Sequence, residues 1–247
     1  AGARGHRAYV VGDVHGRLDL LDALLEKIHA DLGRRGPRDT LLVFVGDLID
    51  RGPHSAEVVE RLRTYQYSGV RPVFLLGNHE EVLLRILEGE ESLIPSWLRF
   101  GGAQCLESYG GDPARLAQLP GREGVAEVRR LVPDEHVTFF RSFADTFRFG
   151  DYLFVHAGIR PGVALEEQRQ SDLRWIRDPF LLDESDHGFV VVHGHTIAAE
   201  VQDRANRIGI DTGAYATGIL TALGIDGTDR WFIDTSVPAD AAVSSTH

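Results

Sequence analysis

The 247-residue sequence contains no methionine, one cysteine (Cys105) and one lysine (Lys27). A single cysteine excludes a disulfide framework within the chain and favours a reducing compartment, so we expect a cytoplasmic protein. No apolar run is long enough to span a membrane, and the N-terminus lacks the apolar core of a signal peptide. Because the sequence has no initiator methionine, we also expect a trimmed N-terminus.

Positive charge is scarce as well. The chain has 26 Lys and Arg residues against 37 Asp and Glu residues, which gives a formal net charge of −11 and a pI of about 5.4. A chain with this net charge lacks the basic surface that nucleic-acid binding requires, so we expect no nucleic-acid partner. The negative net charge does not exclude a small phosphorylated substrate, because bound cations would make the electrostatic potential positive at the site. With 43% hydrophobic residues, the length suits one large domain, which we expect to be a monomer without membrane contacts.

The first part of the chain alternates strand-like and helical patterns. Apolar runs predict strands at 8–11, 40–45 and 70–76, and apolar residues at helical spacing predict helices at 17–32, 55–62 and 80–87. This βαβαβ order predicts an α/β fold in which the strands lie parallel.

Residues 89–149 break the alternation, with helical patterns at 114–119, 125–131 and 135–143. We interpret this segment as a helical insertion, which either caps the functional site or only packs on the sheet edge. A further strand is predicted at 152–155, and closely spaced strands at 189–192, 207–210, 218–225 and 231–233 predict a second, mixed or antiparallel sheet. We expect a single domain over 8–235, with flexible ends at 1–7 and 236–247.

Polar residues recur where these strands end. The motifs are Gly12-Asp13-Val14-His15-Gly16, Gly46-Asp47 with Asp50-Arg51-Gly52, Gly77-Asn78-His79-Glu80, His156-Ala157-Gly158 and His193-Gly194-His195. One Gly-Asp pair is more often an ordinary turn. Several strand ends of this kind indicate a site, because ligands of open α/β sheets bind at the carboxyl ends of the strands.

These strand ends supply oxygen and imidazole donors but no thiolate, a set that suits Mn, Fe, Zn or Mg. Six donors are more than one ion needs, so two ions that share Asp47 are the economical interpretation. The six are Asp13, His15, Asp47, Asn78, His156 and His195. Two ions about 3.5–4 Å apart stabilise an in-line displacement at phosphorus and lower the pKa of a shared water toward ~7.

In this order, the five motifs resemble those of the calcineurin-like metallophosphoesterases, and within them the phosphoprotein phosphatase branch. The resemblance extends from Tyr9 to about Ile225 and is strongest to bacterial and bacteriophage lambda serine/threonine protein phosphatases. Further matching stretches are Trp97–Gly102, Trp175–Arg177 and Ile210–Ala214. The resemblance implies two mixed β-sheets sandwiched by helices, with a helical insertion near the active site.

The resemblance also implies a role for each motif residue. Asp13, His15 and Asp47 would hold one divalent ion, and Asp47, Asn78, His156 and His195 the second, with manganese expected first. His79 would be the general acid, oriented by Asp50, because a histidine beside a ligand can reach the substrate oxygen while a partner acid fixes its tautomer. Arg51 and Arg177 would bind phosphoryl oxygens, since their planar guanidinium groups suit a bidentate contact. A surface salt bridge is the alternative for either arginine.

We therefore expect a metal-dependent phosphomonoesterase that acts by in-line attack of a hydroxide bridging the two metals. Its substrate would be a phosphorylated protein, at serine, threonine or tyrosine, or a small phosphoester. The first alternative is a symmetrical dinucleoside tetraphosphate hydrolase, whose second motif departs from the Asp50-Arg51-Gly52 pattern. A metal-binding pseudoenzyme or scaffold is less favoured, because every expected ligand is present.

Three further residues, His193, Ile197 and Cys105, lie in or near these motifs or in the insertion. His193 is interpreted as a packed histidine more readily than as a partner of the site. Ile197 follows the fifth motif where bacterial relatives commonly have proline, which alters loop stiffness and not ligation. Cys105 is interpreted as a small buried apolar residue.

Overall fold

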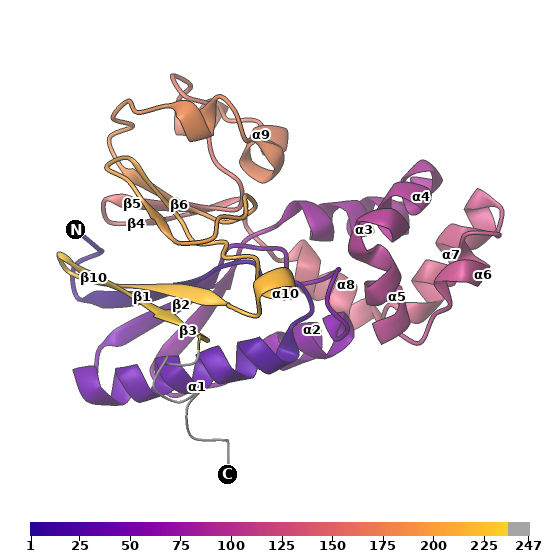
Figure 1. The fold of residues 1–247 in the computed structure, drawn as a ribbon, viewed down its shortest axis with the longest axis horizontal. Helices are drawn as coiled ribbons and strands as arrows, with labels where there is room; N and C mark the ends of the chain where they lie inside the picture. The colour runs from indigo at the N-terminus through magenta and orange to yellow at the C-terminus, as the bar shows by residue number, and fades with distance from the viewer. Residues whose placement is uncertain (237–247) are drawn as a thin grey trace, which may run out of the picture.

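The computed structural model describes residues 1–236, which form two mixed β-sheets with helices on their outer faces (Figure 1). The strand order of the first sheet is β10-β9-β1-β2-β3, and that of the second is β4-β5-β6-β8-β7. The first sheet comprises β1 (His6–Val11), β2 (Asp39–Phe44), β3 (Val70–Phe74), β9 (Thr221–Asp226) and β10 (Asp229–Asp234). The second comprises β4 (Thr146–Phe149), β5 (Tyr152–Val155), β6 (Val190–His193), β7 (Gln202–Asp203) and β8 (Arg207–Gly209). The predicted α/β fold with two mixed sheets is confirmed.

Strand β1 is buried on both faces, which explains its continuous apolar sequence. Because successive side chains point to opposite faces, Tyr9 and Val11 belong to the core under the helices. Ala8 and Val10 belong to the core between the two sheets. The strand pairs in parallel with β2 and antiparallel with β9.

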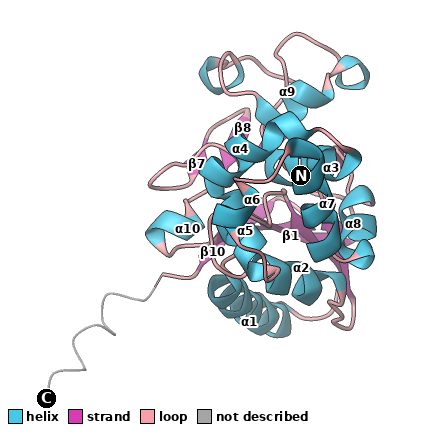
Figure 2. Cartoon of the chain, turned by 90° about the vertical axis from the view of Figure 1, so that its right-hand side faces the viewer, coloured by secondary structure: helices cyan, strands magenta, loops and turns pink. Residues whose placement is uncertain are grey.

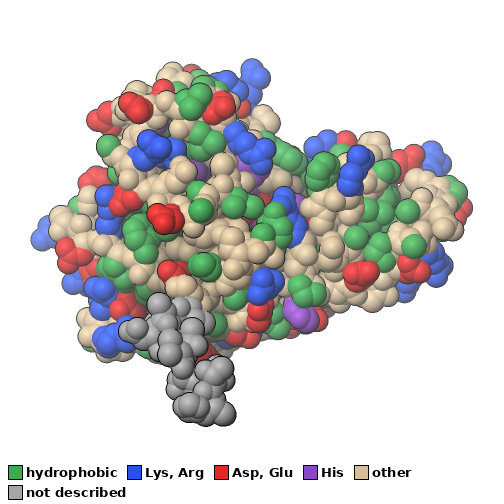
Figure 3. Space-filling view, in the orientation of Figure 1, with side chains coloured by type: hydrophobic (Ala, Val, Ile, Leu, Met, Phe, Trp, Pro, Cys, Tyr) green, Lys and Arg blue, Asp and Glu red, His purple; other side chains and the backbone are tan. Residues whose placement is uncertain are grey.

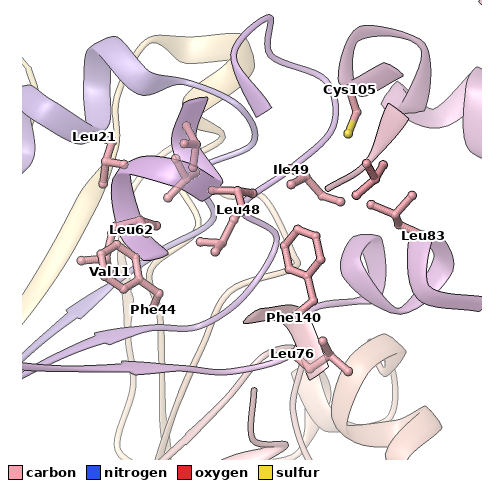
Figure 4. Close-up of a cluster of buried hydrophobic side chains, with 14 of the residues drawn as sticks. Val11, Leu21, Phe44, Leu48, Ile49, Leu62, Leu76, Leu83, Cys105 and Phe140 are labelled. Atoms are coloured by element: carbon pink, nitrogen blue, oxygen red, sulfur yellow. The ribbon is translucent and has the colours of Figure 1, made fainter. Parts of the chain in front are cut away.

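Helices cover the outer face of each sheet. On the first sheet lies α1 (Leu18–Arg35), with α2 (Ser55–Arg63) beside it, whereas α3 (Asn78–Glu88) packs against helices of the insertion. The buried residues Leu21, Leu24, Leu25 and Ile28 form the inner stripe of α1. On the second sheet, Leu173 of the short helix α9 (Gln170–Trp175) joins a separate apolar core. The loop after β2 is anchored too, because Leu48 and Ile49 extend into the main core near Phe140 (Figure 4).

The insertion is a group of helices beside α2 and α3 (Figure 2). After a 3₁₀ turn (Glu91–Leu93) come α4 (Ile94–Trp97), a π-helical turn (Leu98–Gly102), α5 (Ala103–Ser108), α6 (Pro113–Leu116), α7 (Gly121–Leu131) and α8 (Asp134–Arg141). Residues 146–149 form strand β4 of the second sheet, so the helical segment is shorter than the predicted 89–149.

Other predicted boundaries need correction. The strands predicted at 218–225 and 231–233 belong to the first sheet, because β9 crosses back to pair with β1 and places Leu223 and Ile225 between the sheets. Strands β4 and β7 were not predicted. At the N-terminus, β1 already begins at His6, inside the predicted flexible arm, and Arg7 is buried. Of the predicted tail 236–247, all but Ser236 lies outside the described residues. No helix in the described part is long and apolar enough to cross a membrane.

Candidate active site

The predicted site residues follow the carboxyl ends of strands from both sheets. They are Asp13 after β1, Asp47 to Arg51 after β2, Asn78 and His79 at the start of α3, His156 directly after β5 and His195 just after β6. The structure brings His15, Asp47 and His79 together, with one donor atom of each within 4.8 Å of the others. It brings Asp47, His156 and His195 together within the same limit. Asp13 belongs to neither group and is linked to them through the backbone N–H of His195, which donates to its Oδ2 over 3.0 Å.

Asp47 lies at the centre of this arrangement. Its Oδ2 is 3.4 Å from Nε2 of His156, 3.7 Å from Nε2 of His15 and 3.9 Å from Nε2 of His79. On one side, Oδ1 of Asn78 lies 2.9 Å from ring nitrogens of both His156 and His195. Burial opposes ionisation of Asp47, but the neighbouring imidazoles outweigh it and hold the pKa of this carboxyl well below its usual range.

Backbone carbonyls orient two of the histidines. Nδ1 of His15 lies 2.9 Å from the carbonyl oxygen of Ile49, and Nδ1 of His156 lies 2.9 Å from that of Val45. In His15, when Nδ1–H donates to the carbonyl, Nε2 is left unprotonated and faces Asp47, as a metal-binding imidazole requires. Burial holds the pKa of His15 at about 3, which keeps this ring neutral.

Unfavourable backbone conformations are concentrated in the site. Among the described residues, the five non-glycine residues with positive φ are His15 (47°), Asp47 (49°), Asp50 (70°), Arg51 (68°) and His195 (63°). Each such conformation costs about 1–3 kcal/mol and persists only where surrounding contacts enforce it. The fold therefore stores strain at the predicted site residues.

Glu80 makes contacts that hold the strained loop after β2 in place, although the sequence analysis gave this residue no role. Its buried carboxylate accepts the backbone N–H groups of Leu48 at 2.7 Å, Asp47 at 2.9 Å and Gly77 at 3.1 Å. It therefore joins the β2 loop to the start of α3. The available signal was its position three residues after Gly77, where a glutamate commonly caps a helix.

His79 and Asp50 form a buried pair. Nδ1 of His79 lies 2.6 Å from Oδ2 of Asp50, and the aspartate is 0% exposed. Burial would lower the pKa of His79, but the negative charges of Asp47 and Asp50 outweigh it and raise the pKa to about 9. The two carboxylates thus favour the protonated imidazole, whose Nε2–H can act as a proton donor.

These residues open onto a cavity of about 450 Å³. His15, Asp47, His79 and Arg51 contribute to its lining, together with Asp211 and the apolar residues Val82, Leu93, Trp97, Phe100, Trp175 and Ile197. The surface is hollowed between the part that carries α9 and the helical insertion, with histidine and basic side chains beside the hollow (Figure 3). Phe100, Trp175 and Ile197 are exposed at its rim.

Arg51 and Arg177, two of the three arginines that line this cavity, lie in different settings. Nη2 of Arg51 lies 3.5 Å from Nε2 of His79, and Nη1 of Arg51 donates to the hydroxyl of Tyr215, which no sequence motif had identified. Arg177 is exposed and borders the cavity. Arg174, by contrast, is buried and ion-paired with Asp145 at 2.6 Å.

The donor set fits divalent cations. Oδ1 of Asp13 is buried without a hydrogen-bond partner. Burial raises the pKa of Asp13 well above its usual range, and the charges of Asp211 and Asp47 raise it further. The pKa of Asp211 is itself raised to about 6, first by burial and also by Asp47. Bound cations would offset this surplus of negative charge.

His193 lies behind the site and not in it. Its ring packs against Phe180, with the ring centroids 5.1 Å apart, and its Nδ1 is 3.0 Å from the carbonyl oxygen of Gly194. These contacts agree with the interpretation of a packed histidine.

Comparison with known proteins shows which family the chain matches and which proteins it is similar to. Residues 6–226 match the family described as calcineurin-like phosphoesterase. Serine/threonine-protein phosphatase 1 of Salmonella typhimurium is 30% identical, over 86% of this chain and 89% of its own. The asymmetrical bis(5'-nucleosyl)-tetraphosphatase PrpE of Halalkalibacterium halodurans is 28% identical, over 87% of this chain and 88% of its own.

Solved structures share the fold at lower identity. A structure described as a candidate diadenosine tetraphosphatase has a TM-score of 0.65 at 21% identity and covers 95% of this chain and 96% of its own. A cold-active protein tyrosine phosphatase has a TM-score of 0.56 at 17% identity and covers 89% of this chain and 73% of its own. At these identities the likeness concerns the fold alone.

Proposed function

Because this chain belongs to the calcineurin-like phosphoesterase family, we propose that it is a metal-dependent phosphomonoesterase acting on phosphorylated serine, threonine or tyrosine side chains. The observation that carries the proposal is the His79–Asp50 pair, which lies beside the cluster of metal donors and within reach of Arg51. A proton donor, cation sites and a guanidinium group facing one cavity are what hydrolysis of a phosphoester requires.

In this proposal, two divalent ions, manganese first among them, are held by oxygen and imidazole donors. Asp13, His15 and Asp47 would hold one ion, and Asp47, Asn78, His156 and His195 the other. When bound, such ions compensate the charge of the phosphoryl oxygens and lower the pKa of water.

The arginines bind and orient the phosphoryl group. Arg51 is held by two contacts from Tyr215, whose hydroxyl accepts its Nη1–H and whose ring centroid lies 4.6 Å from its guanidinium carbon. Such an anchored guanidinium loses little freedom when it binds phosphoryl oxygens. Arg177 reaches the same cavity from the loop after α9 and would bind a second side of the phosphoryl group.

The proton transfer belongs to His79. A serine or threonine alkoxide is a poor leaving group, so its oxygen takes a proton as the phosphorus–oxygen bond breaks. Nε2–H of His79 donates this proton while water adds to phosphorus from the opposite side. Asp50 keeps the proton on Nδ1 and stabilises the charged ring.

A second candidate function is hydrolysis of a dinucleoside tetraphosphate. Relatives named for this activity include the asymmetrical enzyme PrpE and a symmetrical bis(5'-nucleosyl)-tetraphosphatase, the type of enzyme that the sequence analysis gave as the first alternative. The exposed aromatic rings of Phe100 and Trp175 at the cavity rim offer surfaces on which a nucleobase could stack.

One assay distinguishes these functions. The manganese-loaded protein is given a phosphoserine peptide, p-nitrophenyl phosphate and diadenosine tetraphosphate in parallel, with Asp47→Asn as the inactive control. We expect the highest kcat/KM on the phosphopeptide. A higher kcat/KM on diadenosine tetraphosphate would replace the first function with the second, and no turnover of any substrate would refute both.

A further inference from the structure

On the basis of the proposed function, we infer that Trp97 is a positioning residue for the proton transfer. Its indole N–H holds the Asp50 carboxylate in place and, through that carboxylate, orients the His79 imidazole. Trp97 comes from the helical insertion, which lies far in the sequence from the motif that contains Asp50.

The contact is buried and two-sided. Nε1 of Trp97 lies 3.2 Å from both Oδ1 and Oδ2 of Asp50, and the tryptophan is 3% exposed. His79 bonds to Oδ2, whereas Trp97 donates to both oxygens; the Cys105 thiol also lies within hydrogen-bonding reach of this carboxylate. An indole N–H shared by both oxygens holds the carboxylate in position and so supports its contact with the imidazole.

The backbone beside Trp97 holds the next residue of the same motif. The backbone N–H of Arg51 donates to the carbonyl oxygen of Gly101 at 2.9 Å, in the π-helical turn that follows Trp97. Gly101 has φ of 116°, and a Cβ there would lie 2.5 Å from Cγ of Arg51. At Gly102, a Cβ would lie 2.3 Å from Cε2 of Trp97. The two glycines let this turn close over the motif.

These contacts distinguish the two roles expected for the insertion. A segment that only packed on the sheet edge would not contact Asp50 and Arg51. This insertion contributes a side-chain donor to one and a backbone acceptor to the other.

Removal of the indole N–H takes away the donor that both oxygens of the buried carboxylate share, so the carboxylate is held less firmly against the imidazole. The imidazole then donates its Nε2 proton less effectively. We expect Trp97→Phe, which keeps an aromatic ring but removes the donor, to slow turnover of a phosphoserine peptide about tenfold. Turnover of p-nitrophenyl phosphate should change much less, because nitrophenolate leaves without a proton.

Trp231→Phe is the matched control. Nε1 of Trp231 also donates to an aspartate, Oδ2 of Asp31 at 3.0 Å, but at the far edge of the first sheet. This variant should keep the wild-type ratio of the two rates. A double variant tests the pathway: Trp97→Phe should add little to Asp50→Asn, because both changes act through the same carboxylate.

A spectroscopic readout is independent of turnover. The chain has three tryptophans, so ¹⁵N labelling yields three indole N–H signals, which single Trp→Phe variants assign. Asp50→Asn should move the Trp97 signal and leave the Trp231 signal in place.

The outcomes separate the inference from the function on which it rests. A wild-type protein that hydrolyses neither substrate would refute the proposed function. An active wild type whose Trp97→Phe variant is unchanged, or slowed equally on both substrates, would overturn the inference. So would a Trp97 signal that does not respond to Asp50→Asn.

Discussion

Replacement of Glu80 by glutamine should loosen the loop that carries Asp47. Each carboxylate oxygen accepts two backbone N–H groups: Oε1 those of Leu48 and Ile49, and Oε2 those of Asp47 and Gly77. A glutamine keeps one oxygen and turns an NH₂ group toward the other two donors. Two buried N–H groups are then left without an acceptor.

The expected cost follows from this count. An unsatisfied buried donor costs about 1–3 kcal/mol, so two of them cost roughly 2–6 kcal/mol. The removed charge had repelled that of Asp47, which offsets part of the loss, and we expect a net destabilisation of about 2–4 kcal/mol. That is a large part of the ~5–15 kcal/mol by which folded domains are stable.

Urea unfolding of the metal-free protein measures this cost without interference from bound ions. Glu88→Gln on the same helix is the control, because Glu88 is exposed and pairs with Arg141 at 3.4 Å. Its midpoint should stay at the wild-type value. If Glu80→Gln were also as stable as the wild type, the carboxylate would not be holding the loop.

Three more perturbations test other parts of the structure. His79→Asn should slow hydrolysis of a phosphoserine peptide roughly 10²–10⁴-fold, with unchanged metal content and a distinctly smaller effect on p-nitrophenyl phosphate; equal slowing of both substrates would exclude its role as proton donor. Arg177→Ala should weaken inhibition by inorganic phosphate together with catalysis, whereas Arg174→Ala, whose guanidinium is ion-paired away from the cavity, should leave that inhibition unchanged. Burial opposes ionisation of Asp31, but hydrogen bonds, the Tyr9 hydroxyl first, outweigh it and lower the pKa of this carboxyl. Asp31→Asn should therefore reduce the free energy of unfolding at pH 7, and its difference from the wild type should narrow as the pH falls from about 4, the unfolded-state pKa, through the lower folded-state value.

The sequence predicted those parts of the site that depend on short motifs of neighbouring residues. An apolar run followed by Gly-Asp marks a strand that delivers a carboxylate to the sheet edge, and Asp13 and Asp47 both lie at such ends. Periodicity also located α1, α2 and β5 within a few residues of their observed bounds.

Contacts made across long sequence separations could not be predicted in this way. Trp97 meets Asp50 over 47 positions, and Tyr215 meets Arg51 over 164, so no local spacing links either pair. The same limit misplaced β9, whose buried sequence fits either sheet until its pairing with β1 is known. The short strand β7 has two residues and carries almost no pattern.

Metal titration of the chelated protein tests the central claim most directly, namely that phosphoester hydrolysis depends on two ions held around Asp47. Protein freed of metal should be inactive, and phosphate release should rise with added Mn²⁺ until two equivalents per chain are bound. Asp47→Asn should recover neither activity nor full metal content. Full turnover by the chelated protein, a plateau at one equivalent, or normal metal content and activity in Asp47→Asn would contradict the claim.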